Sequence, residues 1–165
     1  MTTQRYGKSV LLSELVALSL GGFLFHGRVH PVAQHPSNVI AALSGVLSII
    51  AVPLLFSFKK TLPYGYVLNG FLAILGTLVM GHFALVHWPH PATLRAILLN
   101  TTLADILIVW SKFLVGKSLF DLEFYGYDPN KVRKGHPYRY PNLGWWGIHF
   151  VAVGIVYTLG HILWR

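Results

Sequence analysis

Five apolar segments, each about as long as a helix needs to be to cross a bilayer, dominate this chain of 165 residues. They lie at residues 10–25, 39–58, 64–88, 94–115 and 143–164. A helix satisfies its own backbone hydrogen bonds in lipid, so each segment is predicted to span the membrane. Only 11% of the residues are charged, against about 25% in a typical soluble domain. We therefore predict an all-α, polytopic integral membrane protein, a compact bundle of five transmembrane helices forming one domain over residues 1–165.

The connections between these segments are mostly short, which predicts that consecutive helices lie antiparallel and adjacent. Pro53 is expected to kink the second span near its end. The one long connection, residues 116–142, mixes acidic, basic and aromatic side chains. Such a composition suits an interfacial segment with its rings among the lipid headgroups and its basic groups on anionic lipid. We predict a cytoplasmic interfacial loop there.

The basic residues divide unequally between the two sides of this topology. Ten of the thirteen Lys and Arg residues fall on one side. These ten are Arg5, Lys8, Lys59, Lys60, Lys112, Lys117, Lys131, Arg133, Lys134 and Arg139. The positive-inside rule makes that side cytoplasmic, with the N-terminus inside and the C-terminus outside, which for a bacterial chain means the inner (plasma) membrane. Topology thus explains the basic residues, and we expect membrane lipid rather than nucleic acid as a partner.

The histidines divide in the opposite sense. Seven of the nine lie toward the non-cytoplasmic side, namely His26, His30, His35, His82, His87, His90 and His161. The chain has no cysteine, so imidazole and carboxylate are the metal-ligand types that remain. Imidazole is also the commonest haem ligand among side chains without sulfur. This layer of histidines is the first candidate site.

Three of these histidines come from separate predicted helices at similar depth. A b-type haem between helices needs two facing imidazoles, which His82 with His161, or His82 with His26, would supply. Glycines in the third and fifth spans would admit a flat macrocycle, and they would equally allow close helix packing. The leading hypothesis is a small membrane subunit that binds haem b near the non-cytoplasmic face. It would serve electron transfer or quinone chemistry together with other subunits of a membrane complex.

Two alternatives remain open, and the sequence does not decide whether the chain is an enzyme. His26, His30, His87 and His90 would suit copper, zinc or iron held at the membrane surface by a metal-binding enzyme or metal-handling protein. Dense histidine boxes of the HxxHH kind are absent. In the other alternative, the protein is a cofactor-free structural or assembly subunit whose histidines serve packing and docking.

Three further ionisable residues fall within the predicted spans. Asp105 lies near the middle of the fourth span, where a carboxylate must face the bundle interior, and it is a candidate proton-transfer or quinone-binding group. Glu14 is expected to pair with Lys8, Lys112 or Lys117. Lys112, close to the predicted end of its span, is expected to snorkel to the interface.

Overall fold

The computed structural model describes residues 2–29, 33, 36, 38–86, 102–135 and 141–163. Over these residues the protein is entirely helical, apart from short turns. The helices are α1 (Thr3–Val29), α2 (Asn38–Ile49), α3 (Ala51–Ser57), α4 (Leu62–Val86), α6 (Thr102–Tyr125), α7 (Pro129–Gly135) and α8 (Leu143–Leu163). The prediction of an all-α fold is confirmed for the described part of the chain.

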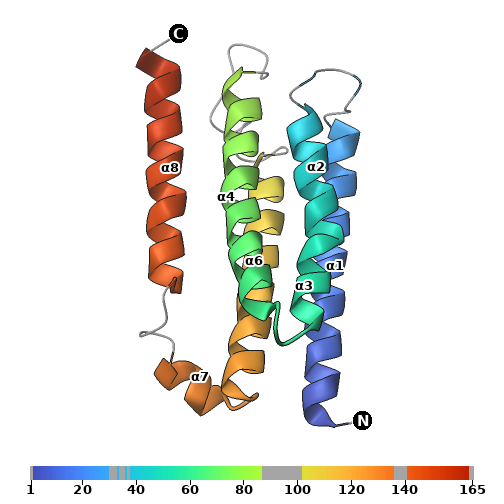
Figure 1. Ribbon diagram of the computed structural model, residues 1–165. Helices are drawn as coiled ribbons and strands as arrows, with labels where there is room; N and C mark the ends of the chain where they lie inside the picture. Colours follow the sequence, from blue (N-terminus) through green and yellow to red (C-terminus); the bar gives the residue numbers. More distant parts are fainter. Residues whose placement is uncertain are drawn as a thin grey trace.

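The long helices run side by side as a bundle (Figure 1). Helix α6 packs against both α1 and α4, α2 lies along α1, and α8 packs against α4. The start of α1 and the end of α8 lie at opposite ends of the bundle (Figure 1). We call the end that carries the start of α1, the α3–α4 turn and α7 the basic end.

Helices α2 and α3 form one rod that is interrupted at Ile50. The interruption follows from Pro53, which has no N–H to donate to the carbonyl of Ile49, one turn earlier. Helical bonding continues on either side, since Ile50 N–H donates to Val46 O and Leu54 N–H donates to Ile50 O. The predicted irregularity in the second span is therefore present, three residues before the proline.

Four helical stretches are long and apolar enough to cross a membrane. They are Thr3–Arg28, Asn38–Ser57, Leu62–Met80 and Leu143–Gly160. The described part of α6 is not among them, because every stretch of 18 residues within it contains at least three charged side chains, drawn from Asp105, Lys112, Lys117, Asp121 and Glu123. Large apolar side chains on the outer faces, such as Ile148 and Val156 of α8, are exposed, as expected of surfaces that face lipid. Four candidate spans fit a membrane protein, whereas a fifth crossing is not established.

The fourth predicted span differs from the helix that forms. Of predicted residues 94–115, those before 102 lie outside the described residues, and α6 continues ten residues beyond 115. It ends where Gly126 and Tyr127, both with positive φ, donate their N–H groups to Leu122 O, a left-handed C-terminal cap. The segment expected to be a loop from residue 116 therefore begins as helix, and it also contains α7.

Aromatic rings form much of the core between α3, α4, α6 and α8. The fully buried large side chains include Phe56, Phe113, Phe120 and Trp146. The Trp146 indole N–H donates to the Tyr66 hydroxyl at 2.8 Å, and that hydroxyl donates to the carbonyl of Pro141. These contacts fix the start of α8 on α4 and leave the space between α1, α2, α4 and α6 to the site described next.

Candidate functional site

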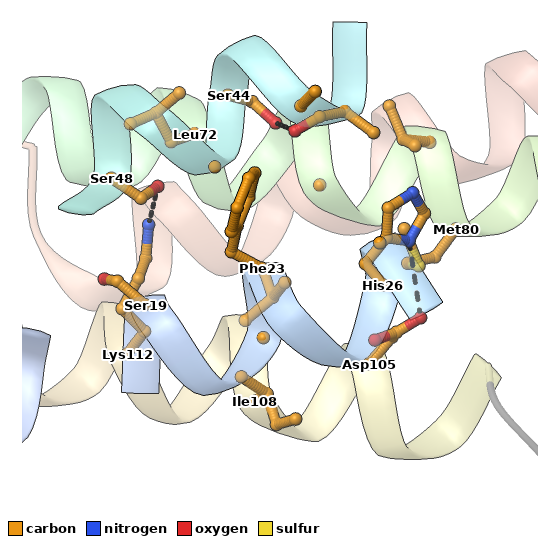
Figure 2. Close-up of a pocket in the computed structure, with 18 of the residues that line it drawn as sticks. Ser19, Phe23, His26, Ser44, Ser48, Leu72, Met80, Asp105, Ile108 and Lys112 are labelled. Carbon is orange, nitrogen blue, oxygen red and sulfur yellow. Dashed lines mark hydrogen bonds and ion pairs between the residues drawn. The ribbon is translucent and has the colours of Figure 1, made fainter. Parts of the chain in front are cut away.

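A cavity of about 240 Å³ lies between α1, α2, α4 and α6. Most of its lining is apolar, and polar side chains gather at its two ends. Figure 2 shows His26 and Asp105 at one end, Lys112 and Ser48 at the other, and Phe23 between them. Interhelical cavities with an apolar body and a few convergent polar groups are typical ligand sites.

The end remote from the basic end holds an imidazole and a carboxylate from different helices. His26 Nδ1 of α1 lies 3.7 Å from Asp105 Oδ2 of α6. Both side chains are largely buried, with 12% and 5% of their surface exposed. Asp105 belongs to the first turn of α6, where the helix dipole stabilises a negative charge. This separation is longer than a hydrogen bond, so one ligand hydroxyl oxygen could lie within about 2.8 Å of both atoms.

Lys112 occupies the other end of the cavity. The residue is only 4% exposed, and its ammonium group donates to Ser48 Oγ of α2 at 2.9 Å. The expectation that Lys112 snorkels to the interface is therefore wrong. The reason is that α6 runs to Tyr125, which places Lys112 well inside the helix, facing α2 rather than water.

The apolar body of the cavity depends on close helix contacts. Phe23 of α1 packs against Gly45 of α2, where an added Cβ would lie 2.4 Å from the phenyl ring. Met80 of α4 lies beside His26, and Ile108 of α6 lies between Asp105 and Lys112, so both contribute to the apolar wall (Figure 2). The hydroxyls of Ser19 and Ser44 also line the cavity, and each donates to a carbonyl of its own helix. The middle of the cavity is thus suited to a flat or chain-like apolar group.

The histidines proposed as haem ligands have different surroundings. His82 Nδ1 is hydrogen-bonded to the Tyr157 hydroxyl of α8, and the two rings meet edge to face at 6.1 Å. His26 lines the cavity and His82 does not. His161 lies in α8, but its side chain is outside the described residues. The structure therefore brings His26 to Asp105 and His82 to Tyr157, and the haem hypothesis stays a prediction.

The alternative metal site falls mostly on residues that the structure does not describe. His30, His87 and His90 lie outside the described ranges, and only His26 of that set can be located. Among the described residues, no group of three or more His, Asp and Glu side chains is arranged to hold a metal ion. The copper, zinc or iron hypothesis remains a prediction.

The charged groups near the basic end pair differently from expectation. Lys8 Nζ lies 3.1 Å from Glu123 Oε2, and Glu123 Oε1 accepts a hydrogen bond from the Tyr127 hydroxyl. Lys117 pairs with Asp121 one turn along α6. Glu14, expected to pair with Lys8, Lys112 or Lys117, is exposed and forms no ion pair with them. The Lys8–Glu123 ion pair thus connects the start of α1 to the end of α6.

Comparison with protein-family models gives no match, and comparisons with curated proteins and with solved structures give none either. The function proposed below is therefore inferred from the cavity.

Proposed function

We propose that this protein is a small membrane subunit that binds a membrane-soluble quinol in the cavity between α1, α2, α4 and α6. The observation that supports this proposal most directly is the His26–Asp105 pair at the end of an apolar cavity. A quinol hydroxyl would donate to the Asp105 carboxylate and accept from the His26 ring. The apolar lining would surround the quinol ring.

Asp105 also suits the proton release of quinol chemistry, while His26 orients the quinol oxygen. Oxidation of a quinol releases two protons and two electrons, and the Asp105 carboxylate, which accepts the hydrogen bond from the quinol hydroxyl, is a suitable acceptor for the first proton. The electrons would pass to the haem b expected from the sequence or to a redox cofactor of a partner subunit. An intramembrane acid that faces a cavity is a functional-site candidate by default, and here it has an imidazole beside it.

Binding of a short-tailed hydroquinone, kept reduced, to purified protein in nanodiscs tests this proposal. Replacing Asp105 by Asn keeps the volume and removes the charge, so the charge-assisted hydrogen bond is lost. We expect the hydroquinone to bind Asp105→Asn about tenfold or more weakly than it binds the unchanged protein.

Asp128→Asn is the matched control, because the same chemical change is made outside the cavity, in a turn where Asp128 Oδ1 accepts from Asn130 N–H. Its affinity for the hydroquinone should be unchanged. Absence of binding to the unchanged protein, or equal binding to Asp105→Asn, would overturn the proposal.

A further inference from the structure

The Lys112 end of the cavity contains a buried cation whose charge no carboxylate of the described residues neutralises. Lys112 donates one hydrogen bond, to Ser48 Oγ. No carboxylate of the described residues lies within ion-pair distance of its ammonium group, in contrast to Lys8 and Lys117. An ammonium has three N–H donors, and burial of a charge without compensation is costly. An electron-rich ligand atom beside Lys112 would offset that cost.

Lys112 and Asp105 both line the cavity and both belong to α6. They are seven residues apart in α6, which is close to two full turns, so both lie on nearly the same helix face. Both line the cavity, at opposite ends (Figure 2). The rise between their Cα atoms along the helix axis is roughly 10.5 Å. The cavity therefore has a hydrogen-bond donor with positive charge at one end and an acid–imidazole pair at the other.

A ring that carries two para oxygens can place one oxygen toward each end of such a cavity. The two oxygens lie roughly 5 Å apart, from the C–O lengths and the width of the ring. A hydrogen bond of about 2.8 Å at each end brings the total to roughly 11 Å. A molecule with a single oxygen would reach only one of the two ends.

We propose that the cavity binds a para-quinol across its length, with Lys112 and Ser48 at one ring oxygen and His26 and Asp105 at the other. The inference rests on the proposed function and specifies the ligand further, as a ring with two oxygens in para positions. Ser48 positions the Lys112 ammonium group, which donates to the second oxygen, and Phe23 lies beside the ring. Selectivity would then come from leaving the Lys112 ammonium with only its hydrogen bond to Ser48 Oγ whenever the second oxygen is missing.

The test compares two ligands that differ by one oxygen, namely a decyl-substituted 1,4-hydroquinone, kept reduced, and the decyl phenol that lacks the second hydroxyl. Their dissociation constants are measured in nanodiscs of zwitterionic lipid for the unchanged protein and for Lys112→Met. Methionine keeps most of the length and removes the charge. The exposed Lys60, in the α3–α4 turn, provides the matched control Lys60→Met.

We expect the unchanged protein and Lys60→Met to prefer the hydroquinone about tenfold or more. Lys112→Met should bind both ligands alike, with its affinity for the phenol unchanged. If hydroquinone binds, and Asp105→Asn weakens it while Lys112→Met does not, the two-ended site is overturned and the proposed function stands. If hydroquinone does not bind but decanoate binds in a Lys112-dependent manner, both proposals are overturned in favour of a carboxylate ligand.

Discussion

Trp146 of α8 fills the place where Gly70 of α4 has no side chain. A Cβ added at Gly70 would lie 2.3 Å from the indole ring, and the indole is fully buried with its N–H on Tyr66. Close packing, one of the two uses expected for the glycines in these spans, is therefore realised at this position. The attachment of α8 to α4 depends on it.

Gly70→Ala is expected to destabilise the protein by about 1–3 kcal/mol, because the indole must move from a tightly packed position. Thermal unfolding in detergent, followed by tryptophan fluorescence, measures the change. Gly147→Ala is the matched control, since nothing lies within 4 Å of a Cβ there and alanine favours a helix interior. Equal stability of the two variants would contradict the described packing of α8.

Two buried lysines of α6 are expected to respond oppositely to the same substitution. Lys112→Met removes a charge without an ion-pair partner among the described residues, so stability should stay equal or rise. Lys117→Met takes the ammonium group away from the buried Asp121 carboxylate and should cost about 3–5 kcal/mol. The midpoint of thermal unfolding in the absence of added ligand distinguishes the two. A larger loss for Lys112→Met would contradict the environment described for that residue.

Tyr127 is expected to make stability depend on alkaline pH. Burial raises the pKa of Tyr127 above its usual value of 10.0, and the hydrogen bond to Glu123 and the charge of Glu123 raise this pKa further. A raised folded-state pKa contributes stability that is present below pH ~10 and is lost as the pH rises further, because the unfolded chain ionises first. Tyr127→Phe should lose about 0.5–1.5 kcal/mol at neutral pH.

The slope of stability against pH above 10 is the measurement that isolates this effect. It should be shallower in Tyr127→Phe than in the unchanged protein. Tyr6→Phe is the control, because Tyr6 is exposed and its ring forms no described hydrogen bond. An unchanged slope in Tyr127→Phe would show that another group causes the alkaline loss.

The topology can be tested by labelling single cysteines, since the chain contains none of its own. Gln4→Cys, Lys59→Cys and Asn130→Cys, all at the basic end, should react with an impermeant maleimide from the cytoplasmic side, and Ala33→Cys from the other side. Leu163→Cys at the end of α8 should react from the side of Ala33, as five crossings require. Labelling of Leu163→Cys from the Gln4 side would indicate an even number of crossings.

The haem hypothesis is tested independently of the quinol site. A reduced-minus-oxidised spectrum of protein produced with haem supplied should show Soret and α bands, and His82→Ala and His161→Ala should lose them. His149→Ala is the control, because His149 donates to Trp145 O at 2.7 Å and stacks on the Trp145 ring. A colourless preparation would remove the haem hypothesis.

Much of the fold could be predicted from local pattern. Apolar runs of membrane length predict helices irrespective of neighbours, because lipid leaves the backbone no other partner. Pro53 interrupts its rod for an equally local reason, the missing N–H. Residue type and predicted depth alone indicate Asp105 and His26 as candidate site residues. Their pairing was not predicted, since nothing in the spacing of two separate helices determines which faces meet.

The buried position of Lys112 does not follow from the sequence, because the predicted span ends at residue 115 and the helix does not. A lysine three residues from a predicted helix end is expected to reach water, but α6 extends to Tyr125. The i,i+4 spacing of Lys117 and Asp121 and the apolar Leu119 and Phe120 between them are the local signals of a longer helix. The predicted ion pair between Glu14 and Lys8 is wrong for a related reason, because Lys8 pairs instead with Glu123, in the part of α6 beyond the predicted end.

The sequence by itself determined that this chain forms helices, several of them long and apolar enough to cross a membrane, because an apolar run of that length can satisfy its backbone in lipid only as a helix. Only the tertiary structure decided that His26 faces Asp105, that His82 faces Tyr157, and that Lys112 lies inside a cavity. Those relations depend on helix rotation and on contacts such as Phe23 on Gly45 and Trp146 on Gly70. These contacts are determined by the packing of side chains from segments far apart in the sequence, so the sequence of one helix alone does not specify them.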